Sequence, residues 1–115
     1  MGMFDSVSVR ALDSALDALA LRQRASADNV ANLQTPGYRA RQVAFEDALT
    51  SAVARGQGSI AATETRSSAA TREDGNNVDL DTETLLQIES NLRYQVATQA
   101  MSGTFSSVRT AMRTS

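Results

Sequence analysis

The chain has 115 residues, a formal net charge of -2 from 11 basic and 13 acidic residues, and neither cysteine nor histidine. This composition excludes disulfides, thiolate or imidazole metal sites, cysteine nucleophiles and Ser-His-Asp relays. The length predicts one domain over residues 1–115, but its core must be thin and in need of partners, because Leu, Ile, Val and Phe make up only about 20% of the chain.

The first predicted element is a long helix over residues 5–33, with Asp5 as its N-cap. Its apolar positions recur alternately every three and four residues, which is the spacing of a coiled-coil seam. The seam residues expected to pair with another helix are Leu12, Leu16, Leu19, Val30 and Leu33. Gln23 and Ser26 interrupt the seam. They indicate either a solvated turn near the helix end or a polar layer that sets the register of the pairing.

Residues 34–54 are predicted to form a turn and a short segment. Pro36 biases the preceding residue away from the helical region, and the Pro-Gly pair suits the two central positions of a type II turn. After the turn, the pattern is compatible with an extended piece around residues 42–45 and a short helix that begins at Glu46. Neither piece is strongly periodic.

Residues 55–77 are rich in Ser, Thr, Ala, Gly and Asn, and Ile60 is their only large apolar residue. This composition predicts an irregular, partly flexible connector. The acidic run from Asp74 to Asp81 lacks the glycine and glutamate spacing of a calcium loop, so we expect it to cap the following helix.

A second long helix is predicted over residues 82–113, with acidic residues at its start. At 100° per residue, its large apolar residues form two stripes on nearly opposite sides. The first stripe consists of Leu85, Ile88, Leu92 and Val96, and the second stripe consists of Tyr94, Met101, Phe105, Val108 and Met112. Because a two-helix hairpin covers only one stripe along its length, the other should meet the central segment or, as we favour, another chain.

These elements predict an all-α fold in which the two terminal helices pair in a coiled-coil-like hairpin. The sequence offers no catalytic constellation, no phosphate loop and no metal-ligand set, so we expect no enzyme and no cofactor. The negative net charge and the absence of a known module argue against nucleic-acid binding. We also expect no membrane span and no cleaved signal peptide, because no apolar run approaches about 20 residues and the N-terminus lacks a basic region followed by an apolar one.

Residues 29–49, NVANLQTPGYRARQVAFEDAL, resemble the N-terminal signature of bacterial flagellar axial proteins. The residues that fall on that pattern are Asn29, Asn32, Thr35, Pro36, Gly37, Tyr38 and Arg39. Residues 74–83, DGNNVDLDTE, are similar to the loop before the C-terminal helix in members from the proximal rod. The absence of a large inserted domain agrees with a proximal rod subunit.

The resemblance implies a structural subunit that stacks helically with copies of itself and with other rod proteins, and that links the membrane ring to the rest of the drive shaft. It implies a periplasmic place in the flagellar basal body and passage through the flagellar type III export gate without cleavage. Phe45 and Leu49 match the export-gate element of the family, although a packing pair on a short helix explains them equally well. Another rod subunit, or a cytoplasmic helical adaptor or regulator, stays open as an alternative.

Overall fold

The computed structural model describes residues 6–114, with side chains from residue 7 to residue 113. The elements in chain order are α1 (Ser6–Ala31), β1 (Arg41–Ala44), α2 (Glu46–Ala54), β2 (Thr63–Arg66) and α3 (Leu80–Thr114). The molecule is elongated, with extents of 66 × 25 × 14 Å. The predicted N-cap, Asp5, lies outside the described residues.

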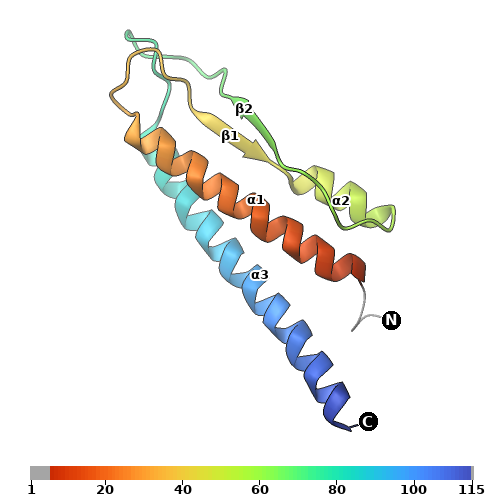
Figure 1. Cartoon of the computed structure of the whole chain (residues 1–115). Helices are drawn as coiled ribbons and strands as arrows, with labels where there is room; N and C mark the ends of the chain where they lie inside the picture. Colours follow the sequence, from red (N-terminus) through yellow and green to blue (C-terminus); the bar gives the residue numbers. More distant parts are fainter. Residues whose placement is uncertain (1–5, 115) are drawn as a thin grey trace.

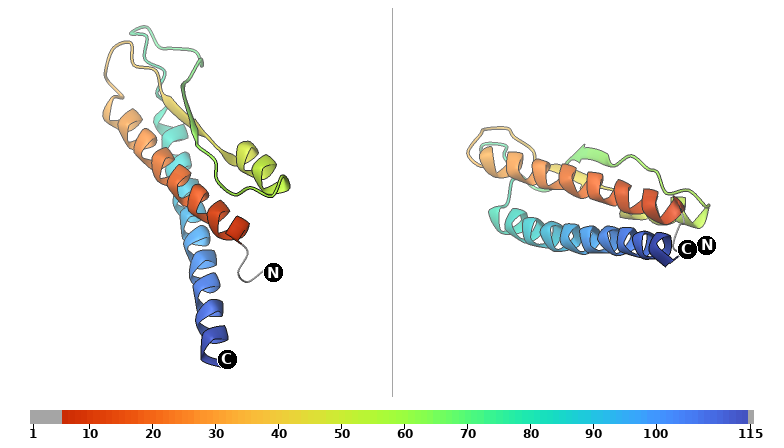
Figure 2. Two further views of the ribbon diagram at one scale, coloured as in Figure 1. Left: turned by 45° about the vertical axis from the view of Figure 1, so that its right-hand side comes forward. Right: turned by 60° about the horizontal axis from the view of Figure 1, so that its bottom comes forward.

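Helix α1 is the central element of the fold. It packs against α3 on one side and against β1 and α2 on the other (Figure 1). The two views in Figure 2 show α1 and α3 running side by side, with α3 continuing past the start of α1. The two long terminal helices and their antiparallel pairing are thus as predicted.

A small antiparallel sheet corrects the all-α prediction. β1 pairs with β2 in a register that places Arg41 opposite Arg66 and Ala44 opposite Thr63. The extended piece near residues 42–45 and the short helix from Glu46 are confirmed by β1 and α2. β2 lies inside the connector that was predicted to be irregular. Its residues are all polar and exposed, so it lacks the apolar alternation by which a strand is recognised in sequence.

The connector is anchored on α1 at Gly58. A β-carbon added to Gly58 would lie 2.4 Å from the carbonyl oxygen of Val7, so only glycine allows this close approach. Ser14 Oγ donates to the carbonyl of Gly58 at 3.0 Å and accepts from the amide of Ile60 at 3.3 Å. These contacts fix the path of the connector along α1.

Among the described residues, the main hydrophobic cluster contains no residue of α3, although Ala97 of α3 is itself buried. This cluster consists of Ala18, Leu19 and Phe45, with Ala15, Leu49, Ile60 and Ala62 packed around them. The residues that α3 buries are Glu83, Ser90 and Ala97, all small or polar. The long helix is therefore held to α1 partly by polar contacts of Glu83 with Ser26 and Asn29, and most of its large apolar side chains stay exposed. Within residues 6–114, no helix combines the length and the hydropathy that a membrane span requires.

Candidate functional site

The two sequence motifs that carry the family resemblance meet at one end of the hairpin. The amide of Tyr38 donates to the carbonyl of Thr35 at 3.2 Å, and Gly37 has a φ of +76°, which confirms the type II turn. The amide of Gly37 then donates to the carbonyl of Asp74 at 2.8 Å. The turn after α1 and the loop before α3 are therefore directly bonded to each other.

Asn76 is the centre of this junction and is completely buried. Its Nδ2 lies within hydrogen-bond distance of the carbonyl oxygens of Asn32 (2.9 Å), Leu33 (3.1 Å) and Thr35 (2.8 Å). Its Oδ1 accepts from the amide of Val78 at 2.8 Å. Asn76 thus satisfies carbonyls left without intrahelical partners where α1 ends, and it fastens the loop before α3 to that end.

Arg72 and Asn77 extend the junction on both sides. Arg72 donates to the carbonyls of Val78 at 2.6 Å and Leu33 at 2.8 Å. Asn77 Oδ1 accepts from the amide of Ala40 at 2.7 Å. Sequence reasoning marked this loop as a motif but assigned no role to Arg72, Asn76 or Asn77. The partners that tie them to the end of α1 and to the turn are more than 35 residues away in the chain, so no local pattern pointed to them.

Asn29 is a second buried asparagine and uses all of its hydrogen-bonding capacity. Its Nδ2 donates to the carbonyl of Arg41 at 2.9 Å and to Glu83 Oε1 at 3.1 Å. Its Oδ1 accepts from the amide of Arg41 at 2.8 Å and from the Tyr38 hydroxyl at 3.1 Å. The nearby Ser26 is also buried, and its hydroxyl donates to the carbonyl of Glu83 at 3.4 Å. Of the two interpretations of Ser26, this geometry favours the polar layer.

The remaining motif residues lie at the surface of the turn. Asn32 Nδ2 donates to the carbonyl of Asp28 at 2.8 Å, and its Oδ1 accepts from the Thr35 hydroxyl at 3.0 Å. Pro36 and Arg39 are exposed, and Arg39 Nη1 donates to the carbonyl of Ser67 at 3.4 Å. The motif thus consists of a buried half that locks the turn and an exposed half that other molecules can contact.

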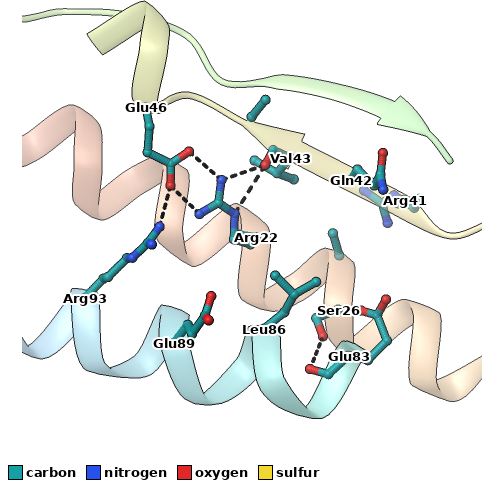
Figure 3. Close-up of a pocket in the computed structure, with 12 residues that line it drawn as sticks. Arg22, Ser26, Arg41, Gln42, Val43, Glu46, Glu83, Leu86, Glu89 and Arg93 are labelled. Atoms are coloured by element: carbon teal, nitrogen blue, oxygen red, sulfur yellow. Dashed lines mark hydrogen bonds and ion pairs between the residues drawn. The ribbon is translucent and has the colours of Figure 1, made fainter. Parts of the chain in front are cut away.

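A cleft of about 520 Å³ between α1, β1 and α3 is bordered by an ion-pair cluster (Figure 3). The guanidinium of Arg22 donates to both oxygens of Glu46, at 2.6 and 2.8 Å, and to the carbonyl of Val43. Arg93 of α3 donates to the same carboxylate at 2.8 Å. The Arg22 hydrogen bonds lower the pKa of Glu46 to about 2. Because Arg22, Glu46 and Arg93 belong to α1, α2 and α3, the cluster joins all three helices. Arg22 also lies 4.8 Å from the Phe45 ring centroid.

Phe45 and Leu49 lie together at the hydrophobic core. Phe45 is buried against Ala18 and Leu19, and Leu49 packs at the edge of the same cluster. In the folded chain both residues therefore have a packing role. In the folded chain Phe45 is covered, whereas Leu49 is half-buried.

The predicted pairing residues are divided between the helix contact and the surface. On α1, Leu19 is buried and Leu12, Leu16, Val30 and Leu33 are half-buried. On α3, the first stripe (Leu85, Ile88, Leu92, Val96) is at least 55% exposed. In the second stripe, Met101 and Val108 are half-buried, whereas Tyr94, Phe105 and Met112 are exposed. Leu12 and Leu19 join Leu92 and Val96 in one shallow apolar groove of about 510 Å³.

Comparison with known proteins identifies the family. The family model described as "Flagella basal body rod protein" matches residues 10–39, which run through α1 and the turn. The flagellar basal body rod protein FlgB of Escherichia coli (strain K12) is 32% identical over 118 residues, covering 84% of this chain and 86% of that protein. This chain belongs to the FlgB family of flagellar rod proteins. FlgB of Bacillus subtilis (strain 168) is 27% identical over 126 residues and covers 97% of both chains. FlgB of Borrelia hermsii is 28% identical over 136 residues.

Membership of the FlgB family establishes the general function. The chain is a structural subunit of the flagellar basal-body rod, and its family acts by assembly rather than by catalysis. It assembles with other rod components.

Proposed function

We propose that this chain is a proximal rod subunit that assembles helically with copies of itself and with other rod proteins, and that links the membrane ring to the rest of the drive shaft. The observation that carries the proposal is the surface of α3. Most of its large apolar residues are exposed, while the residues that it buries are small or polar. A helix with this distribution is incompletely covered in the single chain and gains buried area from neighbours.

The two stripes of α3 are the proposed contact surfaces. The first stripe borders the apolar groove with Leu12 and Leu19, and the second stripe continues along the part of α3 that extends beyond α1. Fully burying one Leu, Ile or Phe side chain stabilises a structure by about 1.5–3 kcal/mol. Several such residues brought together in the rod are enough to decide whether α3 is rigidly ordered, so folding of α3 is coupled to assembly.

The thin core suits export before folding. Only a few of the described side chains form the core, so the isolated chain is loosely held and can travel unfolded through the flagellar type III gate. Phe45, which the folded chain buries, and Leu49, which it half-buries, serve in that state as the export-gate element. The protein then folds and assembles on the periplasmic side of the inner membrane, without cleavage of a signal peptide.

The family assignment bears differently on the two alternatives, another rod subunit and a cytoplasmic adaptor or regulator. Another rod subunit has the same expected architecture, and its distinction from the proximal position rests on where in the rod the loop of residues 74–83 makes its contacts. A cytoplasmic adaptor or regulator finds no support in relatives that are named basal-body rod proteins.

Incorporation into the rod tests the proposed interface. We would express Phe105→Asp in the source bacterium as its sole copy, purify the basal bodies and count the chain by quantitative mass spectrometry. Thr98→Asp, at an exposed polar position of the same helix, is the matched control. We expect Phe105→Asp to be lost from basal bodies and to abolish motility, while its export continues and Thr98→Asp assembles normally. Normal rods with Phe105→Asp would refute the role of the second stripe.

A further inference from the structure

β1 and β2 form a two-stranded sheet, and the surroundings of its two outer edges differ. The amide of Ser67 donates to the carbonyl of Ala40 at 2.7 Å, which identifies a hydrogen-bonded pair next to the sheet. Since such pairs alternate along an antiparallel ladder, the main-chain groups of Arg41 and Val43 point outward from β1. By the same alternation, the main-chain amide and carbonyl groups of Glu64 and Arg66 point outward from β2.

The outer edge of β1 is sealed by side chains of α1. Asn29 bonds both the amide and the carbonyl of Arg41, as a residue of a neighbouring strand would. Arg22 donates twice to the carbonyl of Val43, at 3.2 and 2.7 Å. No further strand can add at this edge.

The outer edge of β2 is open. All four of its residues are exposed, and Figure 1 shows β2 as the outermost element, on the side of β1 away from α3. Within residues 6–114, no strand or side chain bonds the outward main-chain groups of Glu64 and Arg66. An open edge of this kind is a template for another strand.

The charges along this edge show which strand would fit. Arg66 lies directly opposite Arg41 in the sheet, an arrangement of like charges that is unfavourable. Arg41 is neutralised by Asp28 and Glu64, whereas Arg66 makes no ion pair with a carboxylate among the described residues. The guanidinium of Arg66 instead lies 5.2 Å from the centre of the Tyr38 ring and donates to the carbonyl of Arg39 at 2.9 Å. Among the described residues, Arg66 thus lacks a carboxylate partner, and it lies two residues from Glu64, which pairs with Arg41 in the same chain.

We propose that β2 pairs with β2 of a second copy of this chain, antiparallel and centred on Thr65, so that Glu64 of each copy lies opposite Arg66 of the other. Glu64 and Arg66 then form hydrogen-bonded pairs across the interface, and each Arg66 gains a carboxylate. The result is a four-stranded sheet with two-fold symmetry and no open edge.

This contact is distinct from the contacts of the rod. A two-fold interface closes on itself, whereas a helical rod needs interfaces that repeat without closing. The paired strands therefore form a dimer of the free subunit. This dimer covers the open edge of β2 until the subunit assembles into the rod. The proposal does not depend on the stripes of α3, and its test is independent of rod incorporation.

A single cysteine reports on the pairing, because the chain contains none of its own. In the proposed register, the two copies of Thr65 form a non-hydrogen-bonded pair with α-carbons about 4.5 Å apart, which a disulfide can span. The two copies of Thr63 lie four residues out of register, about 13 Å apart. We expect the purified Thr65→Cys chain to form disulfide-linked dimers under mild oxidation at least about tenfold faster than Thr63→Cys. Equal rates would overturn the proposal.

Charge exchange tests the register itself. In the Thr65→Cys background, Glu64→Arg or Arg66→Glu alone brings like charges face to face, and we expect about a tenfold loss of cross-linking for each. Mixing these two variants restores opposite charges at both positions, so cross-linked heterodimers should return to the rate of the parent. Far-UV circular dichroism verifies that each variant keeps its helices. If correctly folded variants cross-link no faster in the mixture than alone, the register is wrong.

Discussion

Gly75 lies directly against Gly37, so that a β-carbon added to Gly75 would be 3.2 Å from the α-carbon of Gly37. The two glycines belong to the turn after α1 and the loop before α3, which are far apart in the chain. Both have positive φ, +76° for Gly37 and +84° for Gly75. The close approach of these two backbones closes the hairpin, and buried Asn76 and Asn29 hold it closed from either side.

Gly75→Ala is expected to destabilise the chain by about 1–3 kcal/mol, because alanine is strained at this φ and its β-carbon meets Gly37. Gly103→Ala is the matched control. Gly103 lies within α3 with open space around it, so alanine there should stabilise the helix by about 0.5–1 kcal/mol. Urea denaturation followed by circular dichroism measures both. A change of the same sign in the two variants would contradict the proposed closure.

Asn29→Asp should cost about 1–3 kcal/mol although it changes the side-chain volume very little. The replacement removes the donor to the carbonyl of Arg41 and places a second carboxylate beside Glu83. Combining it with Glu83→Gln restores a donor between the two side chains and should recover part of the loss. Asn91→Asp, at an exposed position of α3, is the control and should have little effect. A double variant less stable than Asn29→Asp alone would rule out direct coupling of the two residues.

Glu46 should contribute to stability at neutral pH and stop doing so in acid. The Arg22 hydrogen bonds lower its folded-state pKa from 4.5 to about 2. The contribution is therefore complete above about pH 4.5 and is lost as the pH falls through 2. Because the side chain is 44% exposed, we expect Glu46→Gln to cost only about 1–2 kcal/mol at pH 7.

The pH dependence separates this effect from a simple loss of packing. Urea denaturation should show that Glu46→Gln has a lower free energy of unfolding than the parent at pH 7. This difference should disappear at pH 2. Asp47→Asn, exposed on the same helix, should give no such difference. A difference of equal size at both pH values would mean that the ion pairs with Arg22 and Arg93 contribute nothing.

Phe45→Ala is expected to trap the protein in the cytoplasm if Phe45 forms part of an export element. Its packing role must be controlled, since removing a buried phenylalanine costs about 3–5 kcal/mol in any case. Leu19→Ala damages the same core without touching the segment of residues 45–49. Secretion is measured by immunoblotting of cytoplasmic and exported fractions. Equal secretion of the two variants would mean that Phe45 has a packing role and no role in export.

The sequence by itself determined the two long helices of this protein and the turn that follows the first of them. The heptad spacing predicted α1, the acidic start and apolar content predicted α3, and the Pro36-Gly37 pair predicted the type II turn between α1 and β1. These features depend on neighbours within a few residues, so local propensity is enough to specify them. The motif in residues 29–49 likewise pointed to the rod family before any contact was known.

Only the tertiary structure decided which of these parts meet. It placed β2 in a stretch with no strand pattern. Main-chain pairing to β1 supplies the stabilisation that the side chains of β2 do not. It assigned Asn76 to carbonyls more than 40 residues away, and it buried Phe45 against α1. It also showed that α3 buries Ser90 and Ala97 and that Glu83 of α3 bonds to Asn29 of α1. Burial and long-range hydrogen bonds depend on the whole folded chain, so helical periodicity alone could not reveal that both apolar stripes of α3 remain largely uncovered.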